Sequence, residues 1–480
     1  SQAAIRKALR IADATERFHL RLRAQDAALA REAGYHLLPS RPRRTLPRVV
    51  AQAASPAKIV VETTAGSTCA LTAGNKRTGL LIAENDDLAI YQDSTQNATK
   101  AVTVALAQQM TAFYTAYVKN MIPVYWGDVP DIDQNGKVIV FASPKASDDV
   151  AAFVWSGDFY PVASCPASNQ KELIYFNTDL ILDMAGADPT YQALETLAHE
   201  TKHVVSLYNR IAAGRRSVNG DQFHPSWIEE GTAEIAGEVS SRLAWEAAGG
   251  PALNAPITRQ SFQNTGKITP ENYGVAIHLA RTVWYLSSQP NGLVVTPAGA
   301  VAGSSVYGSG WLFHRWLGDA YGGAASARMA DAPLFKALTD SLAAKGLAGL
   351  ANQTGASFLT LYDEFVDAIA LHGTTAPEPT RHFTTYDLVT GAEIFCNPNP
   401  VGVFPWPVTT TGTPIDCSVT PPVAEVSTST AGFGTATYSG RLGISGIRIH
   451  DFLSNGTGTG AQITLDSGSQ PAKMRVVRLR

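Results

Sequence analysis

The sequence has few charged residues and no long hydrophobic run. Asp, Glu, Lys and Arg together make up 16% of the 480 residues, and the formal net charge is -3. This near-neutral balance gives no electrostatic basis for binding nucleic acid or an anionic membrane surface. No apolar run reaches the roughly 18 to 20 residues that a membrane-spanning helix needs. We therefore expect no nucleic-acid partner and no membrane span, and we expect a monomer.

Cysteine is also scarce. The four cysteines are Cys69, Cys165, Cys396 and Cys417, and none forms a Cys-x-x-Cys pair that would indicate a metal or redox site. Cys396 and Cys417 flank a Pro- and Thr-rich loop, and we predict a disulfide between them, the alternative being two unrelated thiols. The chain starts at Ser1 rather than Met, which suggests that an export signal has been removed. These features predict a secreted, cell-surface or periplasmic protein.

Apolar residues are abundant, at 45% of the chain, and the length predicts two or three domains. The order of the elements predicts an α+β fold. We expect an N-terminal helical arm and linker at 1–55, a β-rich segment at 56–95, a large mixed domain at 96–372 and an all-β, sandwich-like domain at 373–480. Three roles stay open for residues 1–55: an inhibitory propeptide, an anchor, or an ordinary packed part of the protein.

Hydrophobic periodicity predicts the individual elements. Strands are expected at 57–66, 78–94 and 136–143, and helices at 3–33 and 98–120. Further helices are expected around residues 189–213, 226–247, 276–287, 308–321, 333–345 and 355–371.

The stretch "ETLAHETKHVVSLYNR" begins at Glu195 and places His199 and His203 four residues apart. On a helix this spacing aims both imidazoles at one point, while Glu200 is displaced by about 100° around the axis. Two imidazoles suit a zinc ion, and the displaced carboxylate suits a general base acting on water. The alternative is two surface histidines on a polar helix face.

A catalytic zinc site needs a third protein ligand. The segment "PSWIEEGTAEIAGE" begins at Pro225 and has helical periodicity, with Glu230, Glu234 and Glu238 on one stripe. A stripe of glutamates is usually a solvated face. Here Glu230 lies between a Trp-Ile pair and a Gly-Thr-Ala stretch small enough to let two helices approach closely, so we select it as the third ligand.

These two motifs resemble those of the gluzincin metallopeptidases. The chain is most similar to the hyicolysin-like peptidases, through "SNQKELIYFNTD" before the first motif and "YGSGWLFHRWLGDAYG" after the second, over roughly residues 57–372. The resemblance implies a zincin-like catalytic domain at 96–372. It implies the following roles: His199, His203 and Glu230 as zinc ligands, Glu200 as general base, and Glu234 as the residue that orients a ligand histidine.

Two departures from the family pattern concern the third ligand. The residue before it is usually Asn and is Glu229 here, so Glu229 remains an alternative ligand. The gap between His203 and Glu230 is 26 residues, which is longer than usual in gluzincins, and we interpret "GRRSVNGDQFHP" as a surface loop that absorbs the difference.

The resemblance also suggests which residue stabilises the oxyanion of the reaction. "VYGSGWLF" resembles the start of the helix that carries the transition-state tyrosine in aminopeptidase N-like gluzincins, which makes Tyr307 a candidate. The alternative is a packing tyrosine, and His224, His278 and His314 are rivals for the same role.

A second metal site is suggested by "DVPDIDQNGKVIV". Asp131, Asp133 and Asn135 match the first half of a calcium-binding EF-hand loop, but the position that should carry a bidentate Glu is Ala142. We favour the alternative that these residues serve turn geometry at a hairpin, and keep Ca²⁺ as a second candidate cofactor beside Zn²⁺.

The sequence thus predicts a secreted zinc-dependent endopeptidase that acts on protein or peptide substrates. The alternative is a catalytically inactive, zinc-binding extracellular adhesion or scaffold protein on a peptidase fold. A cytosolic aminopeptidase is less favoured, because the chain lacks the Gly-x-Met-Glu-Asn-like stretch that positions a substrate amino terminus in that family.

Overall fold

The structure is a computed structural model of the 480-residue chain. It describes residues 2–40, 54–63, 69–95, 100–146, 150–183, 190–217, 222–265, 268–288, 305–323, 327–340, 344–372, 377, 379–388, 424–427 and 449–452.

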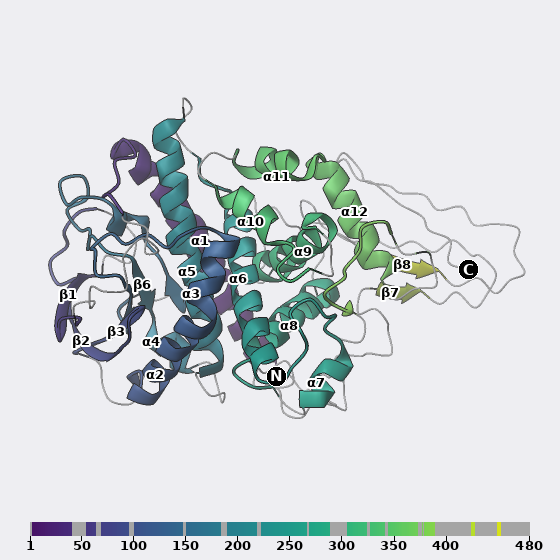
Figure 1. Ribbon diagram of the computed structural model, residues 1–480, viewed down its shortest axis with the longest axis horizontal. Coiled ribbons are helices and arrows are strands. Elements are labelled where there is room, and N and C mark those ends of the chain that lie inside the picture. Colours follow the sequence, from purple (N-terminus) through teal and green to yellow (C-terminus); the bar gives the residue numbers. More distant parts are fainter. Residues whose placement is uncertain are drawn as a thin grey trace, which may run out of the picture.

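A mixed six-stranded sheet forms one end of the molecule, with the strand order β1-β2-β3-β4-β6-β5 (Figure 1). Its strands are β1 (Lys58–Glu62), β2 (Lys76–Glu84), β3 (Leu88–Asp93), β4 (Val138–Ala142), β5 (Ala152–Phe153) and β6 (Leu173–Phe176). The β3/β4 and β4/β6 pairs are parallel, whereas the β1/β2, β2/β3 and β5/β6 pairs are antiparallel. The short strand β5 therefore forms one edge of the sheet.

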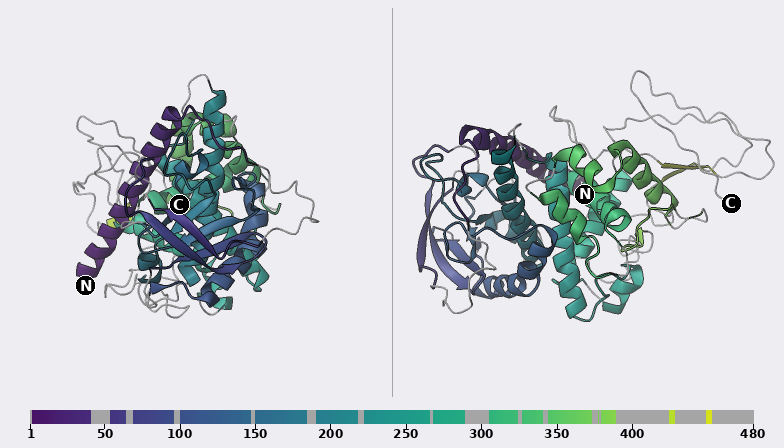
Figure 2. Two further views of the ribbon diagram at one scale, coloured as in Figure 1. Left: turned by 90° about the vertical axis from the view of Figure 1, so that its left-hand side faces the viewer. Right: turned by 45° about the horizontal axis from the view of Figure 1, so that its top comes forward.

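Helices cover one face of this sheet. Figure 2 shows the strands in front of the helices when the sheet end faces the viewer. The helices that pack on the strands include α2 (Val104–Phe113), on β2 and β3, and α5 (Thr190–Arg216), on β5 and β6. A π-helical turn (Tyr114–Val118) and α3 (Lys119–Tyr125) continue from α2, and the short α4 (Thr178–Asp183) precedes α5. Strands β3, β4 and β6 are buried along their whole length, which explains the continuous apolar sequences of β4 and β6.

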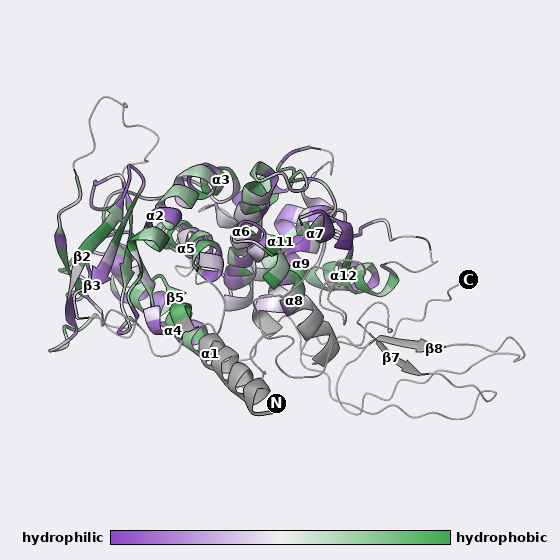
Figure 3. Ribbon diagram, turned by 90° about the horizontal axis from the view of Figure 1, so that it is seen from below, coloured by the Kyte–Doolittle hydropathy of each residue, from purple (hydrophilic) through white to green (hydrophobic). Residues whose placement is uncertain are grey.

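The other half of the molecule is helical. It contains α6 (Ser226–Ala247), α7 (Arg259–Thr265), α8 (Tyr273–Ser288), α9 (Ser305–Tyr321), α10 (Ala332–Thr339), α11 (Gly346–Thr354) and α12 (Phe358–Leu371). Helix α6 packs on α5, α8 and α9 and is buried over most of its length. In Figure 3 hydrophilic, purple segments appear on α6 in the middle of the molecule, so this buried helix carries polar side chains inward.

The N-terminal helix α1 (Gln2–Glu32) crosses the junction between the two halves (Figure 2). Phe18, Leu22 and Ala30 belong to the hydrophobic core. The segment after α1 is also attached to the body, since the Leu38 amide donates to the Phe159 carbonyl at 2.9 Å and the Tyr208 hydroxyl donates to the Leu38 carbonyl at 2.9 Å.

A disulfide joins Cys69, between β1 and β2, to Cys165, ahead of β6. This pair was not predicted from the sequence. The predicted partners Cys396 and Cys417 lie outside the described residues. A disulfide is compatible with an extracellular protein. Among the described helices, none combines the length and hydropathy of a membrane span.

Several elements differ from the sequence predictions. The helix predicted at 333–345 ends at Thr339, because Asp340 takes a non-helical backbone conformation, and α11 and the short α7 were not predicted. The helix predicted at 98–120 is interrupted by the π-helical turn. Of the C-terminal domain predicted at 373–480, the described elements include only a parallel pair, β7 (Ala424–Ser427) and β8 (Ile449–Phe452). The α+β fold class is confirmed for the described part of the chain.

Candidate metal centre

The two histidines of the first motif lie side by side on α5, as their spacing predicts. Their ring centroids are 4.8 Å apart, and the two Nε2 atoms are 3.1 Å apart. Both side chains are buried, because α5 is covered by the sheet on one side and by α6 on the other. Two lone pairs therefore converge in the interior, away from bulk water.

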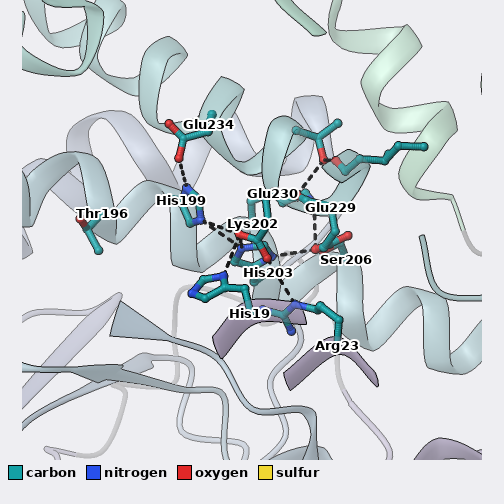
Figure 4. A network of polar contacts seen from close by, with 12 residues as sticks. His19, Arg23, Thr196, His199, Lys202, His203, Ser206, Glu229, Glu230 and Glu234 are labelled. Carbon is teal, nitrogen blue, oxygen red and sulfur yellow. Dashed lines mark hydrogen bonds and ion pairs between the residues drawn. The ribbon is translucent and has the colours of Figure 1, made fainter. Parts of the chain in front are cut away.

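Helix α6 brings a carboxylate to the same point (Figure 4). Glu230 Oε2 lies 3.2 Å from His203 Nε2 and 3.4 Å from His199 Nε2. Glu229, the alternative ligand, lies behind the pair: its Oε1 is 2.7 Å from Nδ1 of His203, on the far side of that ring. Of the two adjacent glutamates, Glu230 is thus the one that faces both Nε2 atoms.

Each imidazole is held by a second carboxylate at its remaining nitrogen. His199 Nδ1 is 3.3 Å from Glu234 Oε1, and His203 Nδ1 is 2.7 Å from Glu229. A carboxylate at Nδ1 keeps the proton on that nitrogen and leaves Nε2 free to bind a metal ion. Glu234 thus contacts the Nδ1 atom of His199, and Glu229 has the same arrangement at the other histidine.

The three converging atoms fit a tetrahedral metal ion. Zinc binds imidazole nitrogen and carboxylate oxygen at about 2.0–2.1 Å, so two ligands of a tetrahedron should be about 3.3–3.4 Å apart. The observed separations are 3.1, 3.2 and 3.4 Å. His199, His203 and Glu230 are accordingly one of three groups in the described residues with spacing suited to a metal ion.

The electrostatics of the site favour a cation. Burial opposes charge on His199, but hydrogen bonds to Glu230 and Glu234 outweigh it and raise the pKa of His199 well above its ordinary value. Burial also opposes charge on Glu230, yet nearby His19 and His203 outweigh it and hold the pKa of that carboxyl well below its ordinary value. The Glu230 carboxyl is therefore held in its ionised form, which is the form that binds a metal ion.

Glu200 follows the first histidine and is 2% exposed. Within the described part of the chain, its Oε2 atom is buried and has no hydrogen-bond partner. A buried carboxylate oxygen without a partner is energetically unfavourable. This oxygen is therefore available to a water molecule or substrate, as a general base requires.

Tyr307 lies at the start of α9, beside this site. Its ring is 6.2 Å from the His19 ring, and the Arg281 guanidinium lies 5.6 Å from the Tyr307 centroid. Arg281 in turn forms an ion pair with Glu234. Tyr307 is thus linked to the group through His19, which contacts both the Tyr307 ring and the Glu230 carboxylate.

The three rival histidines have partners of their own. His224 donates to the Leu338 carbonyl at 2.8 Å, and burial lowers its pKa to about 3. His314 donates to the Gly310 carbonyl at 2.7 Å, and burial lowers its pKa to about 4. His278 stacks on Trp311 and lies 2.9 Å from Glu234. The first two are held as neutral structural groups, whereas His278 extends the Glu234 network.

A second group spaced for a metal ion contains Glu195, Glu234 and His278. Arg281 already forms an ion pair with Glu234, and burial together with the Glu234 charge raises the pKa of Glu195. We interpret this cluster as support for His199 rather than as a separate site.

Asp131 and Asp133, two of the three residues predicted for a calcium site, lie together with a third carboxylate, that of Glu172. Asp131 accepts from the Gly136 amide, and Asp133 accepts from Lys171 Nζ at 2.8 Å and from the Asn135 side chain at 2.9 Å. These bonds favour the interpretation of a hydrogen-bonded turn.

Two residues at the metal centre were not predicted from the sequence. His19 and Arg23, both on α1, contact the Glu230 carboxylate (Figure 4). They carry no recognisable motif, and 207 residues separate Arg23 from Glu230. The helical spacing of the buried Phe18 and Leu22 was the only available signal that this part of α1 packs inward.

A scan against protein-family models and a search of curated proteins both find no match to this chain.

Proposed function

We propose that the protein is a secreted zinc-dependent endopeptidase of the gluzincin type, similar to the hyicolysin-like peptidases, with a zincin-like catalytic domain. The observation that carries the proposal is the convergence of His199, His203 and Glu230, with a second glutamate at the far nitrogen of each imidazole. Structural zinc sites are usually closed by four protein ligands, whereas catalytic sites use three and leave one position open. The three-residue donor set supports the catalytic type.

The chain's own residues supply the proton transfers. His199, His203 and Glu230 would hold the zinc ion, which when bound acts as a Lewis acid that acidifies water and polarises a substrate carbonyl. Glu200, with its unpartnered Oε2, accepts the proton of the attacking water and returns it to the leaving amine. Tyr307 is the proposed donor to the developing oxyanion.

Cleavage of casein and of a quenched fluorescent peptide tests the proposal. The zinc-loaded protein should cleave both substrates, chelation should abolish the activity, and zinc should restore it. Glu200→Gln should bind zinc normally and lose activity by about 10²-fold or more. Glu246→Gln is a matched control, because Glu246 lies on α6 and pairs with the surface residue Arg328.

A zinc-replete protein that is inert to every substrate, both as wild type and in the α1 variants described below, would refute the peptidase. That result would support the inactive zinc-binding adhesion or scaffold protein instead.

A further inference from the structure

Helix α1 covers the metal centre. His19 Nδ1 lies 3.0 Å from Glu230 Oε2, the oxygen that faces the two ligand histidines, and Arg23 Nε donates to Glu230 Oε1 at 3.4 Å. His19 and Arg23 are only 4% and 6% exposed. Both carboxylate oxygens of Glu230, the predicted third ligand, are therefore contacted by α1, a helix that contains neither of the two motifs.

The same turns of α1 are fixed to the edge of the sheet. Asp26, which is fully buried, pairs with Arg23 at 2.8 Å and accepts a hydrogen bond from the Ser156 amide at 3.2 Å. About two helical turns earlier, the Phe18 ring packs edge-on against Phe153 of β5 at 5.3 Å. Helix α1 thus bridges α6 on one side and edge strand β5, with the 3-10 turn Ser156–Phe159, on the other.

This position conflicts with access by a peptide. Peptides commonly bind as an added strand along a sheet edge, and β5 is the sheet edge whose residue Phe153 packs against Phe18. A helix with its side chains is about 10–12 Å across. A peptide extended beside β5 would therefore overlap the turns of α1 that contain Phe18 and His19. The His19 ring also lies beside Tyr307, which is the proposed oxyanion donor.

We propose that α1 is an intramolecular inhibitor, which occupies the substrate side of the metal centre through His19 and Arg23 and is anchored there by Asp26 and Phe18. The inference rests on the proposed peptidase function, because it assigns a regulation to that site. It selects the inhibitory role among the three left open for residues 1–55. Activation then requires α1 to leave its position between α6 and β5.

The anchor can be weakened without altering the metal centre. Asp26 touches neither the histidines nor Glu230, but its loss leaves Arg23 buried beside one carboxylate instead of two. Removal of one partner of a buried ion pair is strongly destabilising, so Asp26→Ala should raise the fraction of molecules with α1 displaced by about tenfold or more. Phe18→Ala, which removes the contact with Phe153, is a second and uncharged variant. Arg17→Ala is the matched control, because Arg17 is exposed on the same helix.

Two readouts in the full-length, zinc-loaded protein separate this inference from the proposed function. The first is calorimetric binding of an uncleavable peptide hydroxamate, which reports access to the metal and needs no catalysis. The second is kcat/KM for the quenched peptide. We expect Asp26→Ala and Phe18→Ala to bind the hydroxamate about tenfold more tightly and to cleave about tenfold faster, with Arg17→Ala equal to wild type.

Unchanged hydroxamate affinity in both anchor variants would overturn the inhibitory role while leaving the peptidase intact. A loss of cleavage in correctly folded anchor variants would overturn it too, because α1 would then be part of the working enzyme. Tighter hydroxamate binding with no cleavage by any variant would support occlusion by α1 and refute the peptidase.

Discussion

Glu229 provides the sharpest test of how the metal centre is held. Its Oε1 is contacted by His203 Nδ1 at 2.7 Å, by Lys202 Nζ at 2.8 Å and by the Ser206 hydroxyl. Burial opposes charge on Glu229, but Lys202 and His203 outweigh it and hold its pKa well below the ordinary value. The ionised carboxylate therefore orients one ligand imidazole and neutralises one buried lysine.

These two roles predict different effects for two substitutions. Glu229→Gln keeps an acceptor for His203 but removes the charge, and loss of such a partner typically weakens metal binding about 10–100-fold, or roughly 1.4–2.7 kcal/mol. Glu229→Ala also leaves Lys202 without its carboxylate, and breaking a buried ion pair costs about 3–5 kcal/mol of stability. Because burial already lowers the pKa of Lys202, deprotonation of the lysine should keep the loss near the lower figure.

Zinc affinity is measured by competition with a chromophoric chelator, and stability by urea unfolding of the zinc-free protein. The double variant Lys202→Met/Glu229→Gln should recover stability, because it removes both charges, but should not recover zinc affinity. Glu246→Gln, on the same helix with a half-buried side chain, should change stability by less than about 0.5 kcal/mol. The reasoning is refuted if Glu229→Gln binds zinc as tightly as the wild type does.

Two further predictions concern the surroundings of the site. A Cβ atom at Gly231 would lie 2.5 Å from His314 Nδ1 and 3.0 Å from the Gly310 carbonyl, so Gly231→Ala should force α6 and α9 apart and lower the unfolding free energy by about 1–3 kcal/mol; an unchanged urea midpoint would contradict this. Burial lowers the pKa of His224 to about 3, whereas a histidine in the unfolded chain titrates near about pH 6.5. Between these two pH values the unfolded chain binds a proton that the native protein does not. The contribution of neutral His224 to the free energy of unfolding is therefore complete above about pH 6.5 and is lost as the pH falls towards 3. Urea unfolding at pH 7.5 and pH 5 should show the stability difference between wild type and His224→Gln shrinking by about 2 kcal/mol at the lower pH, and a constant difference would show that His224 is not buried in its neutral form.

Features that depend on local sequence were predictable, whereas features that depend on contacts between distant residues were not. The convergence of His199 and His203 was predictable, because helical periodicity alone places residues four apart on one face. The choice between Glu229 and Glu230 was not. Adjacent residues on a helix point about 100° apart, so the choice depends on how α6 is rotated against α5, where Lys202 lies 2.8 Å from the Glu229 carboxylate.

The differences between the predicted and observed fold also arise from contacts between distant parts of the chain. The helix predicted at 333–345 extends past the true end of α10 at Thr339. At that end the Asp340 carbonyl accepts a hydrogen bond from Arg210 on α5 at 3.0 Å, a contact between distant parts of the chain that helix propensity does not encode. The disulfide Cys69–Cys165 joins residues 96 positions apart, and an even number of cysteines does not reveal which of them pair. Contacts between α1 and α6 are equally non-local.

The concentration of charge at the centre supports a cation site over a network that serves stability alone. Although only 16% of the chain is charged, α5 and α6 bury four carboxylates around the two ligand histidines: Glu200, Glu229, Glu230 and Glu234. Buried carboxylates require cationic partners, and within these two helices Lys202 supplies one at Glu229. The partners of Glu230 and Glu234 come from elsewhere, as Arg23 on α1 and Arg281 on α8. If α1 is displaced, Glu230 loses Arg23 and His19 together, and a bound metal ion is then what neutralises it. In the proposed scheme the Glu230 carboxylate would hold α1 in the closed state and the metal ion in both states, which would couple regulation and chemistry at this one residue.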